Sequence, residues 1–88
     1  MQVNFFSEKQ MLENMNKQRE IQEKQVYIHF KGSCYFVETI AFNSENGDEV
    51  VVYRSLATEE VWVRPLKEFM DIKQTKNGYT YRFTLCDF

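Results

Sequence analysis

The sequence predicts a mainly β protein, a small SH3-like barrel of five to six short strands preceded by one N-terminal α-helix. From residue 26 onward, β-branched and aromatic residues replace the helix formers of the first part. Turn signals recur about every eight to twelve residues, as in small barrels. The chain of 88 residues, 43% apolar, is long enough for one core. We therefore expect a helical extension over residues 1–25 and an SH3-like barrel domain over residues 26–88.

The N-terminal helix is expected to begin at about Glu8, because Ser7 can cap it and Gln10 can reach back to the capping residue. Its apolar face lasts barely two turns and consists of Met11, Leu12 and Met15. Such a helix could dock on its own barrel, join two chains in a homo-oligomer, or stay frayed, since short isolated helices are marginal in water.

Strand-like patterns follow one another with short breaks, and the last pattern alternates strictly between apolar and polar residues. Asn46-Gly47 and Asn77-Gly78 are strong turn signals, and Pro65 ends the fourth strand because it offers no N–H donor. One helical turn before the final hairpin favours an SH3-like topology over a sandwich. The expected strands cover residues 26–30, 35–42, 49–56, 61–64 and 79–85, with the helical turn at 66–70.

Charge and composition exclude several classes of protein. The net charge is −2 and is evenly spread, which argues against binding of duplex nucleic acid through its phosphates. The apolar runs are too short to span a membrane, and no signal peptide opens the chain, so we expect a cytoplasmic protein. Cys34 and Cys86 form no metal-binding or disulfide pattern and are expected to be reduced thiols.

The residues give no support for catalysis. The chain has one histidine, His29, and no nucleophile motif near it, so we expect no enzyme. His29 and Cys34 offer two zinc ligands at best, and the isolated glycines form no phosphate loop, so we expect no metal and no cofactor. The simplest interpretation of His29 is a strand residue whose ring forms a local hydrogen bond.

An aromatic and arginine cluster is the most specific chemical feature. Trp62 and Arg64 are two residues apart on one strand and so share a face, while Val61 and Val63 take the other. If the valines face the core, Trp62 and Arg64 face outward or into a cleft. The candidate ligand-binding residues are Trp62, Arg64, Tyr53, Tyr35 and His29. The competing interpretation makes Trp62 a core residue and ties Arg64 to an acid, Glu38 or Glu68.

The segment Trp62-Val63-Arg64-Pro65-Leu66, followed by Phe69, resembles domain-of-unknown-function family 1653, a small bacterial and phage domain. His29-Phe30-Lys31-Gly32, Tyr35, Val51-Val52-Tyr53 and Leu56 add to the likeness, which covers about residues 26–83. The sequence departs from the family at Asn43, where a histidine is common, and at residues 57–60, where an aromatic-glycine pair is frequent. The resemblance implies a compact domain and no particular activity.

Three functions fit the residues at this point. The first is a non-catalytic binding module that holds a small anionic, nucleotide-like ligand in the aromatic and arginine cleft, and a phage version could sequester a signalling nucleotide. The second is an adaptor that binds a peptide or host protein through its aromatic face or a strand edge. The third is binding of single-stranded nucleic acid, against which the even acidity counts.

Overall fold

The computed structural model describes residues 19–86, and this part of the chain is mainly β, as predicted. Among these described residues a single short helix, α2, interrupts the strands at the point where the sequence predicts a helical turn. The elements are β1 (Val26–His29), β2 (Cys34–Phe42), β3 (Glu49–Ser55), β4 (Val61–Pro65), α2 (Leu66–Phe69), β5 (Ile72–Thr75), β6 (Gly78–Tyr81) and β7 (Phe83–Leu85). In this part of the chain, no helix has the length and apolar character that crossing a membrane requires.

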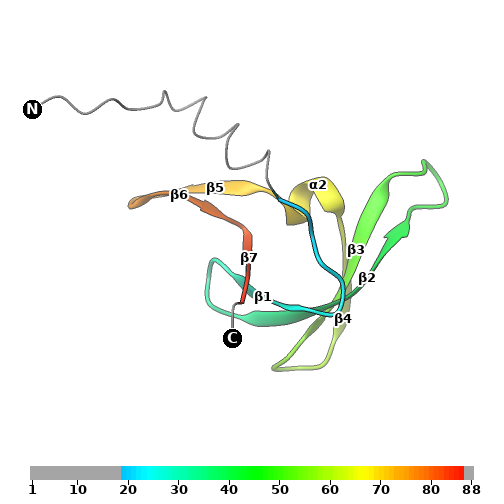
Figure 1. Ribbon diagram of the computed structural model, residues 1–88, viewed down its shortest axis with the longest axis horizontal. Coiled ribbons are helices and arrows are strands. Elements are labelled where there is room, and N and C mark those ends of the chain that lie inside the picture. Colours follow the sequence, from blue (N-terminus) through cyan, green and yellow to red (C-terminus); the bar gives the residue numbers. More distant parts are fainter. Residues whose placement is uncertain (1–18, 87–88) are drawn as a thin grey trace, which may run out of the picture.

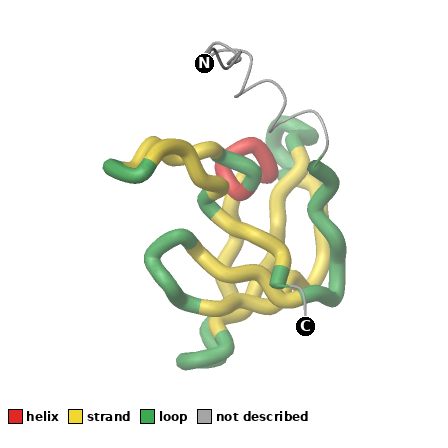
Figure 2. Tube along the Cα trace, turned by 60° about the vertical axis from the view of Figure 1, so that its left-hand side comes forward, coloured by secondary structure: helices red, strands yellow, loops and turns green. Residues whose placement is uncertain are grey.

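The strands form two sheets. Five of them make a curled sheet in the order β4-β3-β2-β1-β7, and β5 and β6 make a separate two-stranded sheet that extends to one side (Figure 1). Strands β4 and β7 do not pair with each other, so the five-stranded sheet is not closed. The expectation of an SH3-like barrel is therefore met only at the level of a curled antiparallel sheet, and α2 follows β4 directly. Figure 2 shows the curl of the sheet and the position of the helix.

Alternation along the strands places one set of side chains inside the curl. The core consists of Tyr27, Val37, Val51, Tyr53, Phe69 and Phe83, each at most 5% exposed. Phe69 enters from α2 and stacks on Phe83 of β7 with ring centroids 4.0 Å apart. Tyr53 of β3 lies 5.5 Å from Phe83 although two strands separate β3 and β7, which shows how strongly the sheet curls.

Both Asn-Gly sequences lie at connections between paired strands, as predicted. Strands β2 and β3 pair across the loop that contains Asn46-Gly47, where Gly47 has a φ of 77°. Strands β5 and β6 pair with Thr75 opposite Gly78, so the two turn residues are Lys76 and Asn77, one position earlier than expected. Gly78 takes the positive φ of 114° that the tight connection requires.

The expected last strand, residues 79–85, is in fact two strands that belong to different sheets. Tyr81 pairs with Ile72 of β5, whereas Phe83 pairs with His29 of β1. Arg82 lies at the crossing and is bonded on both sides, since its N–H donates to Asp71 O and its C=O accepts from Phe30 N. The alternating pattern predicts strand structure correctly, but it does not show that the chain passes from one sheet to the other at Arg82.

The described part of the N-terminal extension, residues 19–25, contains no helix, which corrects the expectation for these residues. Contacts with the sheet replace helical bonds: Lys24 N–H donates to Val37 O, and the Glu23 carboxylate accepts from Ile40 N–H at 2.7 Å. These bonds hold the segment along β2, and Lys24 has a φ of 62°, outside the helical region. The expected helix start at Glu8 and its apolar face lie outside the described residues.

Candidate functional site

The five residues predicted to form the site share one face of the curled sheet. Opposed residues in an antiparallel pair lie on the same face, and Trp62 is opposite Tyr53 while Arg64 is opposite Val51. The Tyr35 ring lies 5.3 Å from Tyr53 and 6.4 Å from His29. We call this set the aromatic face; its members are His29, Tyr35, Tyr53, Trp62 and Arg64.

The sequence left open whether the two valines of β4 face the core, and the structure shows that they do not. Val61 and Val63 do not face the core: they are 57% and 62% exposed, on the convex side of the sheet. Trp62 is on the concave side, yet it is 50% exposed, so the interpretation of Trp62 as a core residue is wrong. The reason is that β4 is an edge strand of the sheet, and no further strand of the described chain packs beside it.

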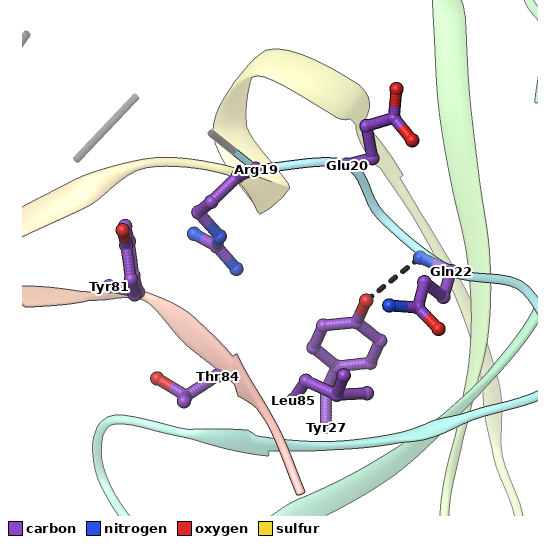
Figure 3. A pocket seen from close by; sticks show the side chains of 7 residues that line it. All are labelled: Arg19, Glu20, Gln22, Tyr27, Tyr81, Thr84 and Leu85. Carbon is purple, nitrogen blue, oxygen red and sulfur yellow. Dashed lines mark hydrogen bonds between the residues drawn. The ribbon is translucent and has the colours of Figure 1, made fainter. Parts of the chain in front are cut away.

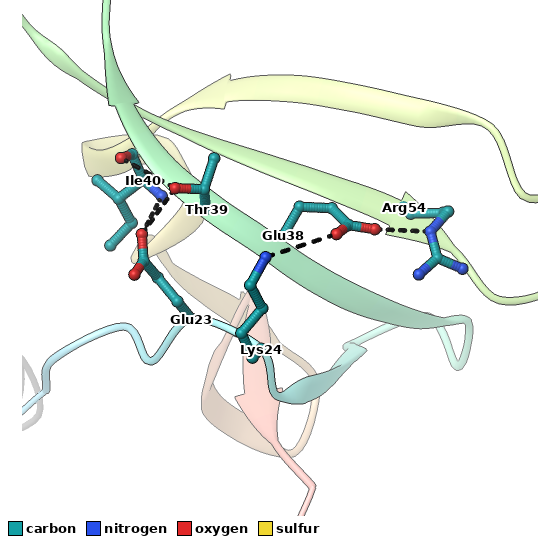
Figure 4. Close-up of polar contacts among 6 residues, drawn as sticks. All are labelled: Glu23, Lys24, Glu38, Thr39, Ile40 and Arg54. Carbon is teal, nitrogen blue, oxygen red and sulfur yellow. Dashed lines mark hydrogen bonds and ion pairs between the residues drawn. The ribbon is translucent and has the colours of Figure 1, made fainter.

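Arg64 is held in place by two contacts. Its Nε donates to the Tyr53 hydroxyl at 3.3 Å, and its Nη1 forms an ion pair with Glu68 at 3.4 Å. Of the two acids named from the sequence, Glu68 is therefore the right one. Glu38 instead pairs with Arg54 at 2.7 Å and with Lys24 at 3.9 Å (Figure 4). A guanidinium has five N–H donors, so Arg64 keeps donors for a further acceptor.

Burial and three cationic side chains act on the His29 ring. Burial lowers the pKa of His29, and the charges of Arg82, Arg64 and Lys31 lower it further. The Lys31 backbone N–H donates to His29 Nδ1 at 3.1 Å, as the expectation of a local hydrogen bond required. A neutral ring therefore carries its proton on Nε2, which is left as a donor. Two of these cations are themselves paired with acids, Arg64 with Glu68 and Arg82 with Asp71.

Sequence reasoning missed Arg82 and the core ring Phe83, which also belong to this region. Phe83 is opposite His29 in the β1–β7 pair, and their rings are 4.9 Å apart. Arg82 binds Asp71 at 2.8 Å, its side chain is 17% exposed, and its Nε is buried without an acceptor among the described residues. No pattern in the sequence marks Arg82, because its position depends on the change of sheet at this residue.

Two pockets lie away from the aromatic face. One, of about 520 Å³, is lined by Arg19, Glu20, Gln22, Tyr27, Tyr81, Thr84 and Leu85 (Figure 3). Its cation is already engaged, because the Arg19 guanidinium lies 3.8 Å from the Tyr81 ring centre and donates to the carbonyls of Met70 and Phe83. The other, of about 360 Å³, lies between the β2–β3 turn and α2 and is lined by Phe42, Gly47, Asp48, Glu49, Pro65, Leu66 and Lys67.

No group of three or more histidine, cysteine or acidic side chains within residues 19–86 is placed to hold a metal ion. Cys34 and Cys86 are free thiols. Burial raises the pKa of the Cys86 thiol, and the neighbouring Cys34 raises it further. A raised pKa lowers the thiolate fraction and hence the reactivity of Cys86.

The chain is therefore a small domain built on a curled antiparallel sheet, with an aromatic concave side that also carries Arg64. The family described as "Protein of unknown function (DUF1653)" matches residues 25–85, and the chain belongs to this family. The chain is similar to a protein of the same family from Bordetella bronchiseptica, whose crystal structure superposes with a TM-score of 0.65. The two share 29% identity over 72% of this chain and 85% of that chain. No curated protein matches the chain.

Proposed function

We propose that the protein is a non-catalytic module that binds a small anionic, ring-bearing ligand of nucleotide type on the aromatic face. The observation that carries the proposal is the position of Arg64 on the aromatic face, where its guanidinium bonds to the Tyr53 hydroxyl, shares the face with Trp62 and keeps N–H donors for a further acceptor. The charges of Arg82, Arg64 and Lys31 lower the pKa of His29, and the same charges favour a phosphate-like anion on this face, although Glu68 and Asp71 offset part of the charge of the two arginines.

Different residues would contact the anionic group and the ring of the ligand. The remaining N–H donors of Arg64 suit a phosphate or carboxylate, because guanidinium groups bind such anions through two parallel hydrogen bonds. His29 Nε2 supplies a further donor. The half-exposed Trp62 ring supplies a surface on which a flat base stacks, and such stacking is worth about 1–3 kcal/mol per base.

The test is a titration with adenosine monophosphate, inorganic phosphate and adenosine, followed by NMR of the only histidine and fluorescence of the only tryptophan. We expect adenosine monophosphate to shift both signals, phosphate to shift His29 alone, and Arg64→Gln to weaken binding about tenfold or more. Arg54→Gln is the matched control, because Arg54 binds Glu38 away from the aromatic face. Equal binding by both variants, or no response to any of the three compounds, would refute the proposal.

The adaptor interpretation has an observation of its own, the exposed apolar side chains of β4, with Val61, Trp62 and Val63 all at least 50% exposed. It predicts that a peptide, and none of the three compounds, shifts the Trp62 signal. Binding of single strands predicts instead a response to a short oligonucleotide that weakens steeply with added salt. The same two spectroscopic signals therefore separate the three functions.

A further inference from the structure

Within residues 19–86 no strand pairs with the outer edge of β4, so its backbone groups are available for pairing. Ser55 N–H donates to Glu60 O at 2.9 Å, so the backbone of Glu60 points toward β3. Because this direction alternates along a strand, Trp62 and Arg64 also bond toward β3, and the N–H and C=O of Val61 and Val63 point away from the sheet. Pro65 has no N–H and ends the usable edge.

The sequence along this edge is self-complementary in an antiparallel arrangement of two copies. The segment Glu60-Val61-Trp62-Val63-Arg64 has an acid at one end, a base at the other, and two valines on either side of a central tryptophan. If two copies run antiparallel with Trp62 opposite Trp62, each Val61 meets Val63 and each Glu60 meets Arg64 of the second copy. No like charges are opposed in this register.

The backbone fits the same register. Val61 of one copy and Val63 of the other both present outward N–H and C=O groups, so each of the two Val61–Val63 pairs exchanges two hydrogen bonds. Trp62 then forms a non-hydrogen-bonded pair at the two-fold axis, where side chains approach most closely. Shifting the register to place Val63 on the axis sets Pro65 opposite Val61, where one hydrogen bond is lost, and moves Glu60 away from Arg64.

We propose that two copies of this chain associate through antiparallel pairing of their β4 strands, with Trp62 at the two-fold axis. The association joins two five-stranded sheets into one continuous sheet, pairs the outer backbone edge of each β4 and sets Val61, Trp62 and Val63 beside the same side chains of the second copy. The partner is a second copy of this chain, because Glu60 of each copy then meets Arg64 of the other at both ends of the pair. The proposal does not depend on ligand binding by the aromatic face.

The first test measures the mass of the full chain by sedimentation across a range of concentrations. We expect a dimer that Val63→Pro converts to a monomer, because this change removes an outward N–H that β3 does not use. Glu60→Arg should weaken the dimer about tenfold, since it opposes two arginines at each end of the pair. Glu59→Arg makes the same charge change at the neighbouring residue and should leave the dimer intact.

The second test fixes the register by disulfide formation, with the oxidised parent chain as the control for Cys34 and Cys86. Trp62→Cys should yield a cross-linked dimer, because residues in a non-hydrogen-bonded pair have Cα atoms about 4.5 Å apart, within the range of a disulfide. Cross-linking of Val63→Cys in its place overturns the register. A monomeric parent chain, or a dimer that persists in folded Val63→Pro, overturns the proposal. Circular dichroism establishes that each variant is folded.

Discussion

Replacing Phe69 by alanine should remove most of the stability of the domain. Phe69 is fully buried, stacks on Phe83 at 4.0 Å and meets the edges of Tyr27 and Tyr53 at 5.6 and 5.3 Å. A buried phenylalanine removes about 200 Å² from water, which corresponds to about 5 kcal/mol at 25 cal/mol per Å². Measured truncations of this kind cost about 3–5 kcal/mol, and a small domain has only about 5–10 kcal/mol in total.

Phe42→Ala is the matched control, because it makes the same chemical change at a side chain that is 70% exposed. Phe42 buries about 60 Å², so its truncation costs at most about 1.5 kcal/mol. Urea unfolding at one fixed protein concentration, followed by circular dichroism, should show a midpoint about 3–4 M lower for Phe69→Ala and about 1 M lower for Phe42→Ala. Equal losses in the two variants would refute the assignment of the core.

Three further predictions concern His29 and the charged side chains that act on it. The pKa of His29 is lower in the folded protein than in the unfolded chain, whose value is about 6.5. The contribution of His29 to the free energy of unfolding is therefore fully present above that pH and is lost as the pH falls. His29→Gln should reduce the loss of stability that urea unfolding shows between about pH 7.5 and 5.5. Arg64→Gln should raise the pKa of His29 in an NMR titration while Arg54→Gln leaves it in place, and an unchanged value in Arg64→Gln would contradict the described geometry. Asp71→Asn should cost about 1 kcal/mol in the same unfolding assay, since Asp71 pairs with Arg82 but is 41% exposed; no loss would mean that the pair is not formed.

The sequence predicted those features that local chemistry determines. Strands β1 to β4 lie within one or two residues of their expected limits, and both Asn-Gly turns connect paired strands. The shared face of Trp62 and Arg64 follows from strand alternation and agrees with the pairing register. These properties depend on neighbouring residues along the chain, which the sequence shows directly.

Features that depend on tertiary partners were not predictable in the same way. The two valines of β4 resemble core residues by composition, but the strand lies at an edge, and edge position is a property of the whole sheet. Residues 19–25 contain strong helix formers, yet the bonds of Glu23 and Lys24 to β2 override that propensity. The place of Arg82 beside His29 results from a change of sheet that no local pattern records.

The two-stranded β5–β6 sheet has a consequence for motion. A lone hairpin is marginally stable in water, and this one is joined to the main sheet through the chain at Arg82 and the Asp71–Arg82 ion pair. Its amide protons should therefore exchange with solvent through local opening, well before those of the central strands β2 and β3. Exchange in β5 and β6 therefore reports whether the Asp71–Arg82 ion pair is formed, although neither strand contains either residue.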